Sequence, residues 1–429
     1  MNTTIAYGNT GILLEREFSS AEVLLSKAHL LASGEDEDAL VRAAMAAPIG
    51  SPTLKELAVG KQTATIIISD HTRPVPSKHI LPFMLKELRQ GNPEIAVTLL
   101  VATGFHRGTT PEELIAKVGQ EIYDQERIVV HDCQDDANCV EIGILPSGAP
   151  LVLNRLAVET DLLIAEGFIE PHFFAGFSGG RKSILPGVCS RTTVLGNHCS
   201  RFIDDPHSRT GILAGNPIHQ DMMAAAKMAK LQYIVNVILN DEKRVVAAFA
   251  GAFDAAHAAG CQLLAQYCQV EPKKRGQIVI TSNGGAPLDQ NVYQAVKGLT
   301  AAEAAAAPGG ILIICARCDN GVGGDGFYQT MKGCSDVSAL LAEIKRTPME
   351  ETKPDQWQYQ ILLRMMERHR IIFVADSSMQ KTLEDMHLEY APTLDEALER
   401  AIDEKGEDAH VVVIPDGIAV IVTPEGLKS

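Results

Sequence analysis

Residues 63–76 read TATIIISDHTRPVP, and this stretch decides the fold. Thr63 to Ser69 is a continuous β-branched run, which is typical of a strand buried on both faces of a parallel sheet. The run passes directly into a polar loop, Asp70 to Pro76, and Ser77 is predicted to be the N-cap of the helix that follows. A strand, a polar loop and a helix in this order predict one unit of an α/β fold.

The same order recurs along the first part of the chain. Ile95 to Thr103 is the next predicted strand, and Thr110 with Pro111 is predicted to start the helix after it. Further strands are predicted at Arg127–His131, Leu151–Asn154, Asp161–Ala165 and Ile234–Leu239. Alternating strands and helices indicate a mostly parallel sheet flanked by helices.

A second series of elements begins near residue 275, after the charged stretch EPKKR at 271–275, which is typical of a linker. Its predicted strands are Gln277–Thr281, Ile311–Ala316, Ile371–Ala375 and His410–Ile414, and its predicted helices are Gln290–Ala307, Val337–Lys345 and Trp357–Arg368. We therefore expect two α/β domains, an N-terminal one over residues 1–270 and a smaller C-terminal one over 271–408. We expect the segment of about 409–429 to be able to pack back on the first domain.

Composition excludes a disordered chain, a collagen and a small disulfide-stabilised protein. The 429 residues are 46% hydrophobic and 21% charged, as in ordinary globular chains, and 38 basic against 54 acidic residues give a net charge of −16. An acidic surface repels phosphate backbones, so we expect no nucleic-acid partner. The sequence shows neither a secretory signal nor a run of about 18 apolar residues. The nine cysteines do not have the regular spacing that is typical of a set of disulfide bonds. We expect a cytoplasmic protein without a membrane partner; the sequence does not indicate its oligomeric state.

Polar clusters follow the predicted strands, where open α/β sheets bind ligands. Asp70 and Arg73 follow the first strand; Arg73 is suited to a carboxylate or phosphate, although an Asp–Arg pair could equally tie the loop down. His106 follows the second strand behind Gly104, and its position is consistent with proton transfer or with a structural role.

The densest cluster is EPHFFAGFSGGRKS at residues 170–183. Backbone N–H groups at Gly179 and Gly180, beside Lys182, would suit an anion, and glycines let a nucleotide approach. A P-loop is excluded because Arg181 stands where that motif needs glycine. A glycine-rich surface turn would explain the glycines but not the cations and His172.

Other signals are weaker. Asn291, Gln294 and Lys297 share one face of a helix start, which suits a carboxylate or is simply a solvated face. His198 in Gly196-Asn197-His198 could be a metal ligand or a turn residue, and His207 and His219 are interpreted as structural. The Cys315/Cys318 pair has no second pair at zinc-finger spacing.

Together these loops resemble the nickel-dependent lactate racemase family. The matching stretches are SDHTRP at 69–74, ATGFHR at 102–107, EPHFFAGFSGGRKSILPG at 170–187, GNH at 196–198 and PLDQNVYQAVKG at 287–298. They occur in the family's order over most of the chain. The resemblance implies a two-domain α/β isomerase whose active site lies in the cleft between the domains, with the cofactor bound by the first.

The resemblance also implies a cofactor and roles for residues. The cofactor would be a nickel-pincer nucleotide, in which a pyridinium-3,5-bisthiocarboxylic acid mononucleotide-type ligand holds nickel. Lys182 is similar to the lysine bonded covalently to it, His198 to the nickel ligand, and His106 and His172 to the acid/base pair. The remaining matches are Asp70, Gly179 and Gly180 for the cofactor, Arg73, Gln294, Tyr293 and Lys297 for the substrate, and, less closely, Trp357.

The implied reaction is racemisation or epimerisation of a 2-hydroxy acid, either lactate or a relative such as malate or a sugar acid. The C2 proton beside a carboxylate is a very weak acid, so reversible hydride transfer through a 2-keto acid is the easier route, and two histidines can move the alcohol proton. We also expect cofactor-biosynthesis proteins as partners. The alternatives are a nucleotide- or nickel-dependent oxidoreductase, although G-x-G-x-x-G is missing, and a non-catalytic organic-acid sensor, which would not need two histidines.

Overall fold

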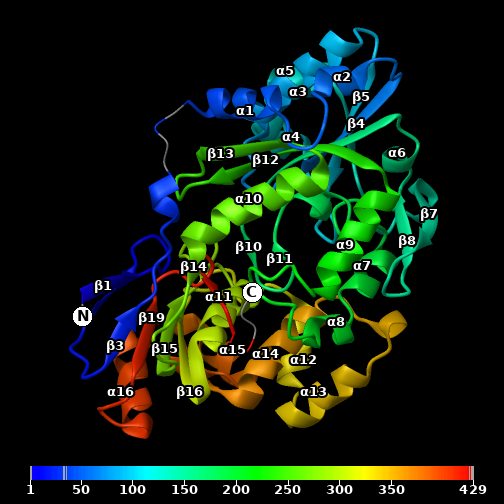
Figure 1. The fold of residues 1–429 in the computed structure, drawn as a ribbon. Coiled ribbons are helices and arrows are strands. Elements are labelled where there is room, and N and C mark those ends of the chain that lie inside the picture. The colour runs from blue at the N-terminus through cyan, green and yellow to red at the C-terminus, as the bar shows by residue number, and fades with distance from the viewer. Residues whose placement is uncertain (1, 32–33, 35, 425, 427–429) are drawn as a thin grey trace.

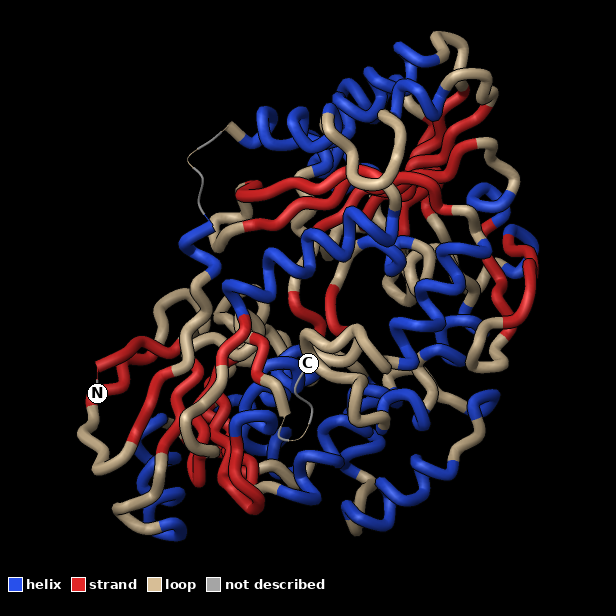
Figure 2. The backbone as a smooth tube through the Cα atoms, viewed as in Figure 1, coloured by secondary structure: helices blue, strands red, loops and turns tan. Residues whose placement is uncertain are grey.

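The computed structural model describes residues 2–31, 34, 36–424 and 426; the ends of the predicted segments 1–270 and 409–429 lie outside the described residues. Two six-stranded sheets organise the chain, one in the upper half of Figure 1 and one at its lower left. Figure 2 shows helices covering both sheets. The predicted mixed α/β class with mostly parallel sheets is confirmed.

The first sheet has the strand order β13-β12-β9-β4-β5-β6, and only the β12–β13 pair is antiparallel among its described strands. Its strands are β13 (Val245–Gly251), β12 (Leu231–Leu239), β9 (Leu162–Phe168), β4 (Thr63–Ser69), β5 (Ala96–Ala102) and β6 (Arg127–Val130). The predicted strand at 151–154 is β8 (Pro150–Asn154), but it pairs with β7 (Cys139–Ile144) in a separate two-stranded sheet.

The second sheet has the order β18-β17-β16-β15-β19-β3, and its described strands are all parallel. Its strands are β18 (Glu389–Ala391), β17 (Arg370–Val374), β16 (Ala306–Cys315), β15 (Gly276–Ser282), β19 (Val411–Ile414) and β3 (Ala21–Val23). Three short pairs complete the strands: β1 (Asn2–Ile5) with β2 (Ile12–Glu15), β10 (Pro171–His172) with β11 (Gly176–Phe177), and β14 (Gln269–Val270) with β20 (Ile421–Val422).

We call the first sheet with α1–α10 the first unit and the second sheet with α11–α16 the second unit. The helices of the first unit are α1 (Glu37–Ala46), α2 (Leu54–Ala58), α3 (Ser77–Gly91), α4 (Pro111–Val118), α5 (Gln120–Gln125), α6 (Arg155–Val158), α7 (Arg191–Asn197), α8 (Ser200–Asp204), α9 (Pro217–Met228) and α10 (Phe253–Cys268). Those of the second unit are α11 (Val292–Ala305), α12 (Asp325–Lys332), α13 (Val337–Arg346), α14 (Gln356–Arg368), α15 (Gln380–Asp385) and α16 (Leu394–Lys405).

Strand β4 is buried on both faces, as its composition predicts. Ile66 and Ile68 pack on one side with residues of α1 to α3. Ile67 points the other way, into a core that also contains Val279 and Leu312 of the second sheet. Because side chains alternate along a strand, one isoleucine run serves two cores, and the second core joins the two units.

The chain crosses between the units more often than a single linker would allow. β3, within the predicted segment 1–270, pairs with β19 in the second sheet. β19, from the segment predicted to pack back on the first domain, lies between β15 and β3 of the second sheet. Because each predicted segment contributes strands to the second sheet, sheet membership does not define domain boundaries, and those at 270 and 408 stay predictions.

Of the two predicted helix N-caps, Thr110 is confirmed and Ser77 is not. Thr110 caps α4 with a capping box formed with Glu113, and Pro111 is its first residue. The prediction that Ser77 is an N-cap was wrong: Ser77 lies inside α3, and its hydroxyl donates to the buried Glu166 at 2.6 Å. A buried carboxylate competes for the hydroxyl that would otherwise have capped the helix.

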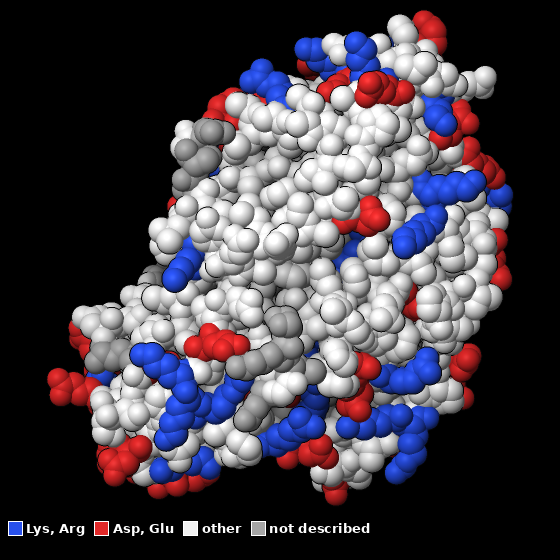
Figure 3. Space-filling view, viewed as in Figure 1, with Lys and Arg blue, Asp and Glu red and all other residues white. Residues whose placement is uncertain are grey.

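On the face shown in Figure 3, acidic and basic side chains are interspersed around the rim and the lower part, and the centre is mostly uncharged. No helix among the described residues is long and apolar enough to cross a membrane.

Candidate active site

The polar loops of the first unit follow β4, β5 and β9, which are neighbours in the first sheet. Because these strands are parallel, their carboxyl ends lie at one edge, as the sequence predicts. The loops touch there: His71 of the first bonds to Thr109 of the second at 3.2 Å, and Gly104 N–H donates to the Gly187 carbonyl at 3.0 Å.

Asp70 is buried at the end of β4 and holds His106. Its Oδ2 lies 2.6 Å from Nδ1 of His106, and its Oδ1 accepts from the Thr72 hydroxyl at 2.7 Å. Burial opposes ionisation of Asp70, but the bonds to His106 and Thr72 outweigh it and lower the pKa of the carboxyl. An ionised carboxylate only accepts, so Nδ1 of His106 carries the proton and Nε2 is left for proton transfer.

Arg73 is exposed and its guanidinium forms no ion pair with Asp70 within the part of the chain that is described. Its Nη1 donates to the Thr72 hydroxyl at 2.9 Å. The loop is held instead by Lys117, whose Nζ donates to the carbonyls of Arg73 and Val75 at 3.1 and 3.4 Å. The alternative in which an Asp70–Arg73 pair ties the loop down is therefore not what the structure shows.

Arg181 stabilises the loop after β9 through hydrogen bonds from its buried side chain. It is 0% exposed and donates to the carbonyls of Ala175, Phe177 and Gly179 at 2.7, 2.8 and 3.2 Å. Of the two adjacent cations in this loop, Arg181 is thus consumed by the protein itself, and Lys182 is the one left for a ligand.

The two glycines before Arg181 are required by protein packing. Gly179 has φ +82°, and a Cβ there would lie 2.7 Å from both the Asn236 side-chain oxygen and the Phe168 carbonyl. Gly180 has φ +53°, and its Cβ would meet the His257 ring at 2.7 Å. Only glycine fits such positions. Their role in cofactor binding stays a prediction.

Lys182, His172 and Lys297 gather on the aromatic side chains of this loop. Nζ of Lys182 lies 3.4 Å from Nε2 of His172. Nζ of Lys297, from α11 of the second unit, lies 5.8 Å from the Phe173 ring centroid. Residues from both units therefore meet here.

Crowding of these cations changes their protonation. Burial, followed by the charges of Arg181, Arg73 and Lys297, lowers the pKa of Lys182 well below its usual value. Burial and the neighbouring Lys182 likewise lower the pKa of His172 well below its usual value. Burial and Arg73 lower the pKa of Lys297 to about 8. A lowered pKa favours the neutral amine of Lys182 and the neutral imidazole of His172, which are the forms that act as a nucleophile and as a base.

His198 follows α7 and is 5% exposed. Its ring packs edge-on against Phe174, with centroids 5.1 Å apart, and against Trp357 at 5.0 Å. Its Nδ1 is buried without a hydrogen-bond partner among the described residues. Burial lowers the pKa of His198 to about 3, so the imidazole is a neutral nitrogen donor. No three His, Cys, Asp or Glu side chains of the described residues cluster to hold a metal ion.

Two other predicted residues of the second unit are linked to this cluster. Trp357 donates from Nε1 to the Tyr293 hydroxyl at 3.1 Å, and Tyr293 donates to Asp355 at 3.1 Å. The Trp357 ring also meets Phe105, next to His106, at 6.2 Å. For Gln294 the recorded bond is at its backbone N–H, which donates to Asn291. The Asn291 side chain is thus the N-cap of α11, and the binding face shared with Gln294 and Lys297 stays a prediction.

His106 and His172 make no direct contact in the described part of the chain, so their facing one another stays a prediction. His219 accepts from Arg181 at 3.0 Å and His207 pairs with Asp205 at 3.0 Å, as expected of structural histidines. Sequence reasoning missed Lys117 and Asp355. Lys117 sits in an ordinary helix pattern and Asp355 in the loop TKPDQW, and neither carries a local signal.

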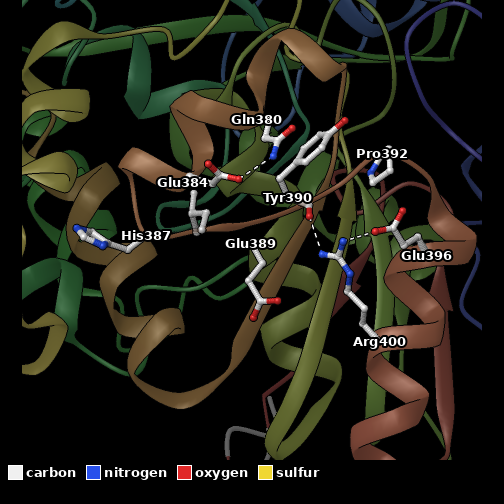
Figure 4. A pocket seen from close by; sticks show the side chains of 9 residues that line it. Gln380, Glu384, His387, Glu389, Tyr390, Pro392, Glu396 and Arg400 are labelled. Atoms are coloured by element: carbon white, nitrogen blue, oxygen red, sulfur yellow. Dashed lines mark hydrogen bonds and ion pairs between the residues drawn. The ribbon is translucent and has the colours of Figure 1, made fainter.

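A surface pocket of about 590 Å³ lies at the edge strand β18, away from the residues above (Figure 4). Its acidic side chains already have partners: Glu389 pairs with Arg370 at 2.5 Å, Glu396 pairs with Arg400, and Glu384 accepts a hydrogen bond from the Gln380 amide at 2.9 Å. None of the predicted site residues lines it, so it is not the candidate site.

Comparison with known proteins identifies the family. The family model described as "Lactate racemase N-terminal domain" matches residues 7–211, and "Lactate racemase C-terminal domain" matches residues 271–422. The chain belongs to the lactate racemase family. The lactate racemase of Thermoanaerobacterium thermosaccharolyticum is 48% identical over 98% of this chain and 99% of its own length. That of Lactiplantibacillus plantarum is 48% identical over 93% and 94%.

The structure agrees with this membership. The lactate racemase apoprotein of Thermoanaerobacterium thermosaccharolyticum superimposes with a TM-score of 0.94 at 47% identity, over 98% of this chain and 99% of that one. Two predictions are confirmed: the resemblance to the lactate racemase family, and an enzyme of the isomerase class, a racemase.

Proposed function

We propose that the protein interconverts the enantiomers of lactate or a closely related 2-hydroxycarboxylate. The observation that carries the proposal is the meeting of Lys182, His172 and Lys297, from two units, beside the neutral imidazole of His198. The two relatives named lactate racemase support lactate as the first substrate to test. Malate and sugar acids share the same 2-hydroxycarboxylate group.

We further propose that the site binds a nickel-pincer nucleotide, and two features of this chain fit that group. Nδ1 of His198 is a buried nitrogen without a partner, and a metal ion would satisfy it. The pKa of Lys182 is lowered well below its usual value, which favours the neutral amine that a covalent bond to its nitrogen requires. When bound, the group would accept a hydride from C2 of the substrate and return it to either face.

The chain's own residues would then bind and orient the substrate. Arg73 and Lys297, one from each unit, would hold the carboxylate, because a guanidinium and an ammonium are its strongest partners. Holding the carboxylate fixes C2 in position for transfer. The nonpolar rings of Phe173 and Phe174 are buried beside Lys297 and Lys182 and would exclude water from part of the site.

Two histidines would move the alcohol proton. His106, oriented by Asp70, presents Nε2, and His172 is uncharged and able to accept a proton. Each would serve one enantiomer, because the hydroxyl points to opposite sides when the carboxylate and C2 stay fixed. Proteins that assemble and load the cofactor are expected partners, and the cytoplasm is the expected compartment.

Isotope retention tests the proposal. Cofactor-loaded protein would be incubated with each enantiomer of lactate carrying deuterium at C2, and the product analysed by chiral chromatography and mass spectrometry. We expect interconversion with the deuterium retained at C2. Loss of the deuterium to solvent would establish proton abstraction instead, and the absence of interconversion would direct the search to the other 2-hydroxy acids.

A further inference from the structure

His198 is oriented in an unusual way for a side chain expected to bind a metal. Such histidines ordinarily donate their second ring nitrogen to a carboxylate or carbonyl, which fixes the ring. Among the described residues neither ring nitrogen of His198 makes a hydrogen bond that would fix the ring, which instead makes edge-to-face contacts with Phe174 and Trp357. Its orientation therefore depends on what fixes those two rings.

The Trp357 ring is fixed by hydrogen bonds within the second unit. Its Nε1–H can only donate, and it donates to the Tyr293 hydroxyl at 3.1 Å. That hydroxyl has one proton, which it donates to Oδ1 of Asp355 at 3.1 Å. The indole can only donate and the carboxylate can only accept, so the two hydrogen bonds run in one direction, from Trp357 to Tyr293 and from Tyr293 to Asp355.

Asp355 is itself held in a demanding conformation. It precedes α14 with φ +63°, in the left-handed region that aspartate tolerates better than most residues. A Cβ on Gly324 would stand 3.6 Å from Oδ2 of Asp355, an ordinary van der Waals distance, so the backbone at 324 lies close to this carboxylate. The carboxylate is half-buried beside α11 and α14, which Figure 1 shows side by side.

We propose that Asp355 is a positioning residue that fixes the ring of His198 through two aromatic side chains of the second unit. The relay crosses between the units, because Asp355, Tyr293 and Trp357 belong to the second and His198 to the first. The carboxylate would therefore set the direction of a nitrogen donor without touching it. The importance of that direction for the reaction rests on the proposed function; the relay itself does not.

The experiment uses the full-length protein without cofactor. Trp357 is the only tryptophan, so its fluorescence quenching by acrylamide reports on the relay alone. Modification of His198 by diethyl pyrocarbonate, followed by peptide mass spectrometry, reports on the ring at the other end. The variants are Asp355→Leu, Asp355→Asn and Tyr293→Phe. Asp336→Leu is the matched control, since Asp336 caps α13 through Ala339.

We expect Asp355→Leu and Tyr293→Phe to raise both the quenching constant and the His198 modification rate, by about threefold or more, because a buried indole N–H loses its acceptor or its fixed geometry. Asp355→Asn keeps an acceptor oxygen and should restore most of the wild-type values. Asp336→Leu should change neither readout.

Unchanged quenching in both Asp355→Leu and Tyr293→Phe overturns the relay. Raised quenching with unchanged His198 modification also overturns the proposal, because the effect would then end at Trp357. Cofactor-loaded enzyme separates the two ideas: if His198→Gln retains full nickel while the apoprotein results hold, the proposed metal role fails and the positioning stands.

Discussion

Nδ1 of His106 lies 2.6 Å from Oδ2 of Asp70, a carboxylate that is 1% exposed at the end of a central strand. The pair joins loops that follow neighbouring parallel strands, so the sheet itself sets the distance. A buried carboxylate that is ionised and bonded on both oxygens fixes the tautomer and direction of the imidazole.

We expect Asp70→Asn to lower kcat by about 10- to 100-fold, because the amide can donate to Nδ1 and favour the wrong tautomer. Steady-state kinetics in both directions, with cofactor occupancy checked by absorbance, measures the effect. Thr72→Val removes the hydroxyl that donates to Asp70 and accepts from Arg73, but it leaves the Asp70–His106 bond in place and should cost less. Equal rates for Asp70→Asn and wild type would show that this pair is structural.

We expect Arg73→Ala to lose about 10²-fold or more in kcat/KM, since a charge-assisted contact to the substrate carboxylate is removed. Arg73→Lys should rescue little because an ammonium cannot reproduce the bidentate fork. The control is Arg107→Ala, an exposed arginine of the neighbouring loop that pairs with Glu113. Near-full activity of Arg73→Ala at intact cofactor occupancy would reduce Arg73 to a loop residue.

We expect intact-mass spectrometry of protein made with the cofactor pathway to show a covalent adduct that Lys182→Ala abolishes. The reason is that burial and the cationic neighbours lower the pKa of this amine well below its usual value and so favour its neutral, nucleophilic form. Lys297→Ala is the matched control: it removes a nearby lysine and should keep the adduct. An adduct that survives Lys182→Ala would place the linkage elsewhere.

The pH dependence of substrate binding follows from Lys297. Its pKa is lowered to about 8 by burial and by Arg73, so the ammonium is present below that pH and is lost as the pH rises through it. We expect KM for the carboxylate substrate to rise above about pH 8. Lys297→Arg stays charged and should show a flat KM over this range. A wild-type KM that is constant between about pH 7 and 9.5 would contradict the assignment.

Much of the fold follows from local sequence. Thr63–Ser69 was predicted with its exact bounds because isoleucines without polar interruption satisfy only a strand buried on both faces. The placement of β3 could not be predicted, since Ala21–Val23 is three residues long and gains its identity from β19, far along the chain. Sheet membership is a long-range property.

The candidate site divides in the same way. Asp70, His106 and Lys182 could be predicted as site residues because each lies in a loop after a parallel strand, and such loops lie together at one edge of the sheet. Arg181 could not be told from Lys182 by sequence, because only the packed loop shows which cation faces inward. Asp355 gave no signal, since its function depends on a tyrosine that is 62 residues away.

Arg181 supplies a prediction on stability. The guanidinium is 0% exposed, and its recorded partners are three carbonyls and the rings of His219 and His257, none of them a carboxylate. Burial lowers its pKa to about 10, so it stays charged at neutral pH. Partners on several sides of one planar group match the fixed fork of arginine, which lysine cannot span.

We therefore expect Arg181→Lys to destabilise the cofactor-free protein by about 2–4 kcal/mol, because carbonyls of the 175–179 loop are left without donors and a cation stays buried. Urea unfolding followed by circular dichroism measures the change. Arg107→Lys, an exposed control, should leave the midpoint in place. Because the same loop carries Lys182, Arg181→Lys should also slow adduct formation at Lys182. A wild-type midpoint together with wild-type adduct formation would mean that the loop is held by Asn236 and the glycines alone.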